Sequence, residues 1–457
     1  MARARSRLVP APGAASRRRL SVPRHRSTTT NVCAIYPGVV QAPLSPVGPL
    51  LGVDLTAGDG PLCWDPFEVY SDGLVTNPNV FVMGEPGFSK SSLIKCWATW
   101  QHCLYGSQRW LTITDPKGEY RALAERIGMT VVRLAPGGVT RLNPLDTAHT
   151  VCGDEAEREM AVQATMLYAL AATLLARSLQ PLERKVLRSI VAILVDRRHR
   201  SAPTLLDVVD LLAAPTDELC AATARTVAEL VRDVEDVRYA LDELCSGHLA
   251  GMFDGPSNVH VDWDGAGLVM DLNGVVDDAR AMALAMVASI GWSRQQRHRL
   301  AGRQRININD ESYYMYKQAE TVEFAQERRK LGRQYGEANI DICHRPSDLA
   351  AQADDGSKVA KMAMGLLSDS SMKIVFRQAA AEMVAATEML SLTDNEQACI
   401  RRLGRGKAIW KIGDRSLLAR HYRPAVLHAL TDTDALMRRP SLLDDHALSG
   451  GRADDEP

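Results

Sequence analysis

The most informative segment of this 457-residue chain is Gly84-Glu85-Pro86-Gly87-Phe88-Ser89-Lys90-Ser91-Ser92. It follows the apolar run Val80–Met83 and precedes the helical run Ser92–Trp100, so a strand, a glycine-containing loop and a helix succeed one another. In that setting, loop amides and the positive end of the helix present donors to phosphate groups. The pattern predicts a phosphate-binding loop (P-loop) for ATP, with all nine residues as nucleotide-binding candidates. The alternative is an ordinary turn between strand and helix.

Two side chains of the loop have specific predicted roles. Lys90 is expected to reach the β- and γ-phosphates, and the Ser91 hydroxyl is expected to ligate Mg²⁺. Ser89 stands where the usual pattern, G-x-x-x-x-G-K-[ST], has its second glycine. A serine forced to positive φ there costs about 1–2 kcal/mol.

A second motif, Ile306-Asn307-Ile308-Asn309-Asp310-Glu311, resembles a strand that ends in two acids. At the carboxyl end of a sheet strand, Asp310 is predicted to hold Mg²⁺ and Glu311 to act as general base on the attacking water. Asn307 and Asn309 interrupt the apolar pattern, and a buried Asn without partners costs about 1–3 kcal/mol. An Asp-Glu pair alone is also common on protein surfaces. It supports a nucleotide site here because a P-loop lies upstream and because the pair ends a strand-like run.

Further candidates follow other predicted strands. The segment Asp115–Tyr120 comes after the run Leu111–Thr114 and is either part of the ligand crevice or an ordinary Pro-Gly turn. His344, after the run Ile340–Cys343, is interpreted as a γ-phosphate sensor or as a structural histidine. Arg333 and Arg377 are candidates for an arginine finger offered to a neighbouring subunit, against the alternative of solvated surface arginines.

The runs between the termini predict an α/β fold. Several apolar runs are continuous, as in strands buried on both faces, and helical stretches separate most of them. A mostly parallel central sheet is therefore expected. Its predicted strands are Val80–Met83, Leu111–Thr114, Thr130–Leu134, Gly267–Leu272, Arg305–Asn309, Ile340–Cys343, Lys373–Phe376 and Ala408–Ile412. From about Asp154 to Leu249 the sequence has helical periodicity and no strand, which predicts an all-α insertion.

Composition and simple motifs give no overall sign of a polyanion-binding protein, a Cys-x-x-Cys metal site, a membrane-spanning protein or a secreted protein. The net charge of −1 gives no overall signal for a polyanion, and the nine cysteines contain no Cys-x-x-Cys pair. No apolar run reaches the roughly 18–20 residues that span a membrane. The first thirty residues contain eight arginines and no acid, and they lack a signal-peptide core. We interpret them as a disordered tail or as an over-extended start, with a polyanion-binding arm as the alternative.

Motifs along the chain together resemble a known family. They are Trp64-Asp65-Pro66, Val75-Thr76-Asn77-Pro78-Asn79, the P-loop, Asp115–Tyr120, Arg141-Leu142-Asn143-Pro144-Leu145, Phe253-Asp254-Gly255-Pro256, Asp310-Glu311, Arg333–Gly336, His344–Asp348, Phe376-Arg377-Gln378, Leu392-Thr393-Asp394 and Gly404–Trp410. This series resembles the ATPases of type IV secretion and conjugation systems, especially the actinobacterial conjugation-associated branch. Those proteins belong to the RecA-like HerA/FtsK superfamily of hexameric motors. The resemblance extends from Pro46 to Pro424.

The resemblance implies a RecA-like P-loop NTPase that uses ATP and Mg²⁺ in a hexameric ring. It implies a cytoplasmic protein at the inner face of the membrane, docked on channel proteins, that energises assembly of the channel or transfer of a substrate such as DNA. Departures from the family are Ser89, Asn309 before Asp310-Glu311 with Ser312-Tyr313 after it, and His344 where related ATPases often carry Gln. The large N-terminal domain of many secretion ATPases is not seen. The alternatives are a non-hydrolysing nucleotide-binding scaffold and an FtsK-like DNA translocase.

The expected organisation has five parts. A disordered Arg-rich tail covers residues 1–45, and a disordered tail covers residues 436–457. The RecA-like ATPase domain is expected in two pieces, 46–150 and 256–435, with the all-α insertion at 151–255 between them.

Overall fold

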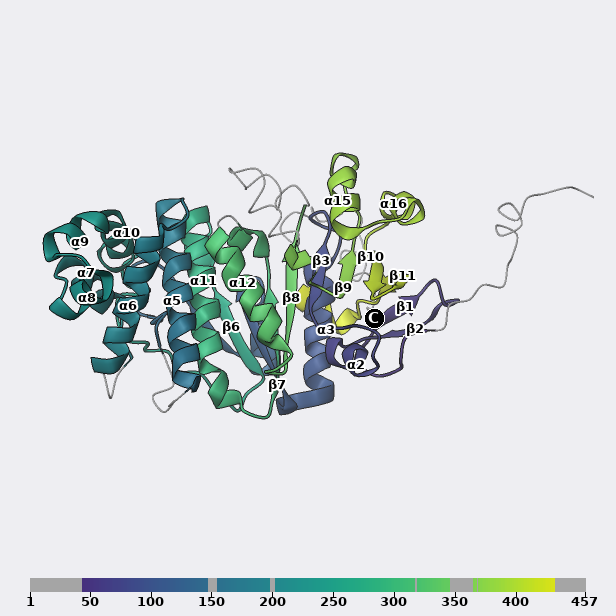
Figure 1. Cartoon of the computed structure of the whole chain (residues 1–457). Coiled ribbons are helices and arrows are strands. Elements are labelled where there is room, and N and C mark those ends of the chain that lie inside the picture. The colour runs from purple at the N-terminus through teal and green to yellow at the C-terminus, as the bar shows by residue number, and fades with distance from the viewer. Residues whose placement is uncertain are drawn as a thin grey trace, which may run out of the picture. The chain divides into compact units, whose positions relative to one another are not determined.

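A single sheet organises the part of the chain that the computed structural model describes, namely residues 43–146, 154–197, 202–316, 319–345, 365–367 and 369–431 (Figure 1). Within these residues the sheet has eleven strands, in the order β2-β1-β11-β10-β9-β3-β8-β7-β4-β6-β5. Neighbouring strands from β9 to β5 are parallel, whereas β10, β11, β1 and β2 join antiparallel. The predicted mostly parallel central sheet is confirmed. Both predicted tails fall almost wholly outside the described residues.

All eight predicted strands are present. They are β3 (Val80–Met83), β4 (Arg109–Asp115), β5 (Thr130–Arg133), β6 (Gly267–Asp271), β7 (Gln304–Asn309), β8 (Glu337–Cys343), β9 (Met372–Val375) and β10 (Lys407–Ile412). Every residue of β3, β4, β6 and β8 is buried. Strand β3 is wholly apolar, as strands buried on both faces usually are, whereas β4 and β8 also bury charged side chains such as Arg109, Glu337 and Asp341.

Sequence reasoning missed the three other strands, β1 (Leu50–Asp54), β2 (Gly60–Cys63) and β11 (Arg415–His421). Each is short or partly exposed, and β2 contains Gly60 and Pro61, which are unfavourable in strands. These strands form because β10 offers an edge on which β11 and then β1 and β2 pair.

Helices cover both faces of the sheet. Along β3, Val80 and Val82 point into one core, and Phe81 and Met83 point into the other. The first core receives side chains from α3 (Lys90–Tyr105) and α4 (Arg121–Ile127). The second receives side chains from α11 (Ala279–Gln295) and α12 (Ala319–Gly332). This is the doubly wound arrangement that the alternation of strands and helices predicts.

The segment between β5 and β6 has no strand among its described residues, and from Asp154 to Ser246 these residues are mostly helical. It contains α5 (Asp154–Leu175), α6 (Pro181–Arg197), α7 (Leu205–Ala213), α8 (Asp217–Thr223), α9 (Val227–Asp233) and α10 (Glu235–Ser246). Helix α5 packs on α11 and α12 and so extends the second core, as Figure 1 shows. The all-α insertion is confirmed, while the boundaries 46–150, 151–255 and 256–435 stay predictions.

Shorter helices flank the remaining strands. They are α2 (Pro66–Ser71) before β3, α15 (Met383–Leu390) and α16 (Asp394–Ile400) between β9 and β10, and α17 (His428–Thr431) after β11.

Polar side chains on β7 form a row across the sheet beneath α11. Asn309 Nδ2 donates to Asp341 Oδ1 at 2.6 Å, and Thr114 Oγ1 donates to Asn309 Oδ1 at 3.4 Å. Asn307 Nδ2 donates to Asn339 Oδ1 at 3.3 Å. The predicted penalty for unpaired asparagines therefore does not arise, because in-register neighbours on β4 and β8 carry matching polar groups.

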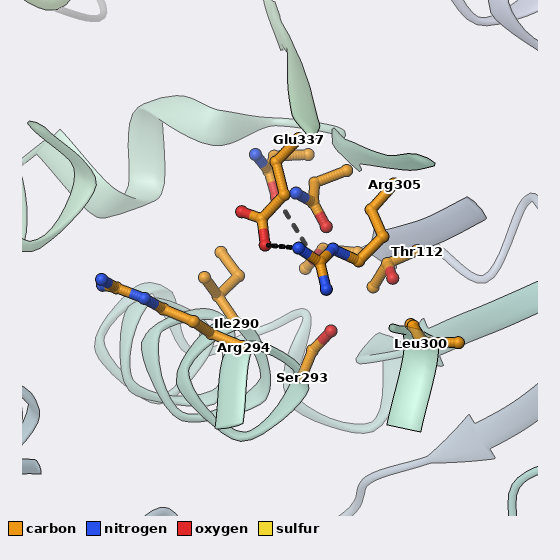
Figure 2. Close-up of a pocket in the computed structure, with 10 residues that line it drawn as sticks. Thr112, Ile290, Ser293, Arg294, Leu300, Arg305 and Glu337 are labelled. Carbon is orange, nitrogen blue, oxygen red and sulfur yellow. Dashed lines mark hydrogen bonds and ion pairs between the residues drawn. The ribbon is translucent and has the colours of Figure 1, made fainter. Parts of the chain in front are cut away.

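The same row continues to the start of β7. Arg305 Nη2 lies 3.2 Å from Glu337 Oε1, and Figure 2 shows this pair above Ile290 and Ser293 of α11. Polar pairs in register therefore alternate with apolar pairs from Arg305 to Asn309 on β7 and from Glu337 to Asp341 on β8.

Candidate nucleotide-binding site

The P-loop connects β3 to α3 and takes the strained form that the sequence predicts. Ser89 lies immediately before the helix with φ 79° and ψ 21°, and Gly87 has φ 80°. A Cβ on Gly84 would lie 2.4 Å from Phe376 Cβ, so the residue must be glycine for the loop to pass the end of β9. The backbone of Glu85 also donates to Arg377 O at 2.9 Å. Packing against β9 thus holds the loop in place.

Lys90 is almost fully buried and turns back onto the loop. Its Nζ donates to Gly84 O at 2.5 Å and to Glu85 O at 3.0 Å. Burial lowers the pKa of Lys90 to about 8, while the carboxylates of Asp310 and Glu311 oppose the shift. A bound phosphate would favour the charged amine further.

The start of α3 has the donors that a phosphate needs. Ser91 is half-buried in the first turn. The buried Ser92 Oγ has no hydrogen-bond partner among the described residues. Loop amides, the Lys90 amine and these hydroxyls together fit a triphosphate. Ser91 stays the predicted ligand of Mg²⁺.

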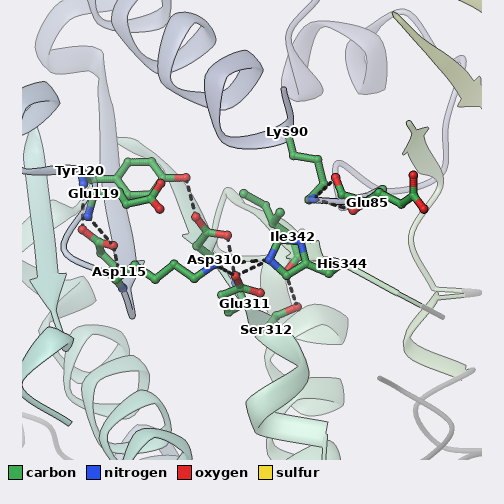
Figure 3. Close-up of polar contacts among 12 residues, drawn as sticks. Glu85, Lys90, Asp115, Glu119, Tyr120, Asp310, Glu311, Ser312, Ile342 and His344 are labelled. Carbon is green, nitrogen blue, oxygen red and sulfur yellow. Dashed lines mark hydrogen bonds and ion pairs between the residues drawn. The ribbon is translucent and has the colours of Figure 1, made fainter. Parts of the chain in front are cut away.

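The acidic pair lies at the tip of β7, two strands from β3 (Figure 3). Asp310 is buried, and its Oδ2 accepts a hydrogen bond from Tyr120 Oη at 3.1 Å. Burial, followed by the nearby charges of Glu311 and Asp115, raises the pKa of Asp310 to about 7. A divalent cation beside this carboxyl would favour its charged form, which fits the predicted Mg²⁺ role.

Two basic side chains contact Glu311. His344 Nε2 lies 2.5 Å from Glu311 Oε1, and the Lys117 ammonium forms an ion pair with the same oxygen. Burial would raise the pKa of Glu311, but the His344 hydrogen bond and the Lys117 charge outweigh it and lower the pKa. Glu311 has φ 49°, a conformation that non-glycine residues rarely adopt. His344, at the end of β8, therefore reaches the acidic pair.

The Asp115–Tyr120 segment is both a turn and part of this cluster. Asp115 Oδ1 accepts from Lys117 N at 3.2 Å and from Glu119 N at 3.1 Å, and its Oδ2 accepts from Tyr120 N at 2.8 Å. Burial raises the pKa of Asp115 to about 6. Sequence reasoning named the segment but neither Lys117 nor Tyr120 as a site residue. The available signal was their position directly after a parallel strand.

The candidate arginines are separated. Arg377 lies beside the P-loop of its own chain, with Nε 3.7 Å from Glu85 Oε2 and its guanidinium 5.2 Å from the Phe88 ring centroid. Arg333 follows α12 and donates to Thr76 O at 3.3 Å, before the start of β3. It therefore lies at the opposite end of the parallel strands.

One further arginine, missed from the sequence, touches the loop. Arg405 Nε donates to Gly87 O at 2.8 Å. Arg405 lies in the Gly404–Trp410 segment, which the resemblance includes.

Solved structures share this fold. The structure of VirB4 of Thermoanaerobacter pseudethanolicus has a TM-score of 0.67 at 17% identity, over 84% of this chain and 99% of that chain. The plasmid coupling protein TrwB in complex with ADP and Mg²⁺ has a TM-score of 0.53 at 16% identity, over 80% and 88%. TrwB with the GTP analogue GDPNP has a TM-score of 0.51 at 17% identity, over 76% and 85%.

These likenesses confirm the resemblance and the P-loop NTPase fold class, at the level of fold. No protein family model matches the chain. No curated protein matches it either. None of the described helices is long and apolar enough to cross a membrane.

Proposed function

We propose that this protein binds and hydrolyses ATP with Mg²⁺ and energises the assembly of, or transfer through, a type IV secretion or conjugation channel. The observation that carries the proposal is the convergence of Lys90, Asp310, Glu311 and His344 at one edge of three adjacent parallel strands. Ligands of open α/β sheets bind at this edge. The likeness to nearly the full length of VirB4 supports the channel assignment.

Each residue of the site has a proposed role. Lys90 and the loop amides from Gly84 to Ser92 bind the phosphates, and Arg377 adds positive charge beside them. Ser91 and Asp310 hold Mg²⁺, which neutralises charge on the phosphate oxygens. Glu311 orients the attacking water and accepts its proton, and His344 positions the Glu311 carboxylate or senses the γ-phosphate.

Arg333 could act as an arginine finger only at an interface between two subunits. Because it lies at the far end of the strands from the P-loop of its own chain, it would reach a nucleotide only on a neighbouring copy. This placement favours a homo-oligomeric ring, most simply a hexamer, with the nucleotide at the interface. In this proposal the ring is cytoplasmic and docks on channel proteins at the inner face of the membrane.

The test is steady-state hydrolysis of ATP with Mg²⁺ by the full chain. Wild type should turn over, and Lys90→Ala and Glu311→Gln should each lose about 100-fold or more. Glu311→Gln should retain nucleotide binding, whereas Lys90→Ala should lose it. The exposed Lys185 on α6 provides the matched control, since Lys185→Ala should hydrolyse like wild type.

Two other results would each support one of the alternative functions. A folded wild-type protein that binds nucleotide without turning it over would support the non-hydrolysing scaffold. Strong stimulation of hydrolysis by DNA would support a DNA translocase instead.

A further inference from the structure

The side chain of Lys117 is partly exposed on a backbone that hydrogen bonds hold in place. Three hydrogen bonds to Asp115 hold the turn from Lys117 to Tyr120, and Gly118 takes the φ of 70° that the turn requires. The Lys117 side chain itself is 44% exposed, compared with 3% for Glu311. Its ammonium can therefore change partners without any movement of the loop.

In this structure the Lys117 ammonium forms an ion pair with Glu311, the proposed catalytic base. Lys117 pairs with Glu311 Oε1, the same oxygen that His344 contacts, and Lys117 Nζ lies 3.4 Å from His344 Nε2. Both donors contact Oε1, and the charge of Lys117 makes the whole carboxylate a poorer proton acceptor. This pairing therefore disfavours Glu311 as a general base.

The same ammonium lies in the proposed reaction site. There the general base Glu311 and the phosphorus under attack lie on either side of one water molecule, so a lysine side chain in contact with Glu311 can turn toward the γ-phosphate. In the strand order β3-β8-β7-β4, Lys117 follows the strand beside the Glu311 strand, and Glu311 and His344 lie between Lys117 and the P-loop. Among the smaller influences on the pKa of Lys90, the positive charge of Lys117 lowers it, so the two lysines share one electrostatic environment.

We propose that Lys117 is a second phosphate-binding lysine that moves from Glu311 to the γ-phosphate, so that binding of a nucleoside triphosphate, but not of a diphosphate, releases the base. This inference rests on the proposed function and adds a residue that distinguishes a bound nucleoside triphosphate from a diphosphate. The γ-phosphate carries more negative charge than one carboxylate, even beside Mg²⁺, whereas Glu311 keeps His344 after Lys117 leaves. ADP has no γ-phosphate and so leaves Lys117 on Glu311.

The experiment measures equilibrium binding by calorimetry, with Mg²⁺ and the full-length chain. The probes are ADP and a non-hydrolysable ATP analogue, and the variants are Lys117→Met, Lys117→Arg and, as surface control, Lys185→Met. Lys117→Met should bind the ATP analogue about tenfold or more weakly, the loss of one charge-assisted hydrogen bond, with ADP affinity changed by less than about threefold. Lys117→Arg should retain part of the preference, and Lys185→Met should match wild type. Retained ADP binding reports that the Met variant is folded.

A double variant tests the exchange of partners. Glu311→Gln no longer holds Lys117 by charge, so its affinity for the ATP analogue should rise above that of wild type. The rise should disappear in Lys117→Met/Glu311→Gln. Equal weakening of both nucleotides in Lys117→Met, no change in either, or a rise that persists in the double variant would overturn the role of Lys117 while leaving the ATPase proposal intact. A wild-type chain that binds neither nucleotide would overturn both.

Discussion

At the residue scale, Ser89 shows how a departure from a motif is accommodated. Its φ of 79° is the left-handed conformation in which the usual motif has glycine. The loop holds this conformation because packing of Gly84 against Phe376 fixes one side and α3 begins on the other. The strain at Ser89 is thus outweighed by the surrounding contacts.

The first prediction concerns this strain. Ser89→Gly should raise the free energy of unfolding by about 0.5–1 kcal/mol, because relief of the left-handed strain exceeds the entropy that glycine adds to the unfolded chain. The measurement is denaturant unfolding without nucleotide. Ser91→Gly is the matched control: it lies in the first turn of α3 without positive φ and should lower stability. A loss of stability in Ser89→Gly would contradict the interpretation.

At the element scale, β7 and β8 are joined by polar side chains as well as by their backbones. The row ends in the ion pair of Arg329 on α12 with Asp341 on β8, both almost fully buried. Asp341 also accepts from Asn309. A helix, the strand of the acidic pair and its neighbour are therefore connected by one polar network.

The second prediction follows from that ion pair. Asp341→Leu and Arg329→Met should each lower the free energy of unfolding by about 3–5 kcal/mol, because each leaves a buried charge without its partner. The double variant should lose much less than the sum of the two. Denaturant unfolding of all four proteins gives the coupling directly, and additive losses would show that the pair contributes no specific stability.

The third prediction concerns β11, which sequence reasoning missed. His421 Nδ1 lies 3.1 Å from Leu51 O, and burial lowers the pKa of His421 to about 4 from an ordinary value near 6.5. Between these two values the unfolded chain binds a proton that the folded chain does not, so stability falls as pH decreases from 6.5 towards 4. From pH 7 to pH 5 the loss should be about 1–2 kcal/mol.

The measurement for His421 is unfolding at several pH values. His421→Gln should flatten the pH dependence by about that amount, whereas a substitution of the exposed His428, His428→Gln, should leave it unchanged. An unaltered slope in His421→Gln would show that another group causes the pH dependence.

At the scale of the whole molecule, the nucleotide site lies on a sheet that both hydrophobic cores share. Side chains of β3 enter both cores, and the P-loop begins at its end. Binding at this edge should therefore stabilise the whole described unit rather than one loop.

The fourth prediction quantifies this linkage. A non-hydrolysable ATP analogue with Mg²⁺, at about 100 times its dissociation constant, should add about 2.7 kcal/mol to the free energy of unfolding. Lys90→Ala should abolish the gain, while the surface variant Lys185→Ala should keep it. Thermal or denaturant unfolding with and without the analogue provides the measurement, and an equal gain in Lys90→Ala would place the nucleotide elsewhere.

Local sequence patterns were enough to predict the parallel part of the sheet, the all-α insertion, the P-loop and the strand-end position of Asp310 and Glu311. These follow from local patterns, because continuous apolar runs predict buried strands and a P-loop needs only neighbouring residues. The antiparallel strands β1, β2 and β11, the partners of Asn307 and Asn309, and the approach of Lys117 to Glu311 depend on how the chain packs and became visible only in the folded structure. Lys117 and Glu311 are 194 residues apart in the chain. Contacts of this kind depend on strand order and register, which no local pattern encodes.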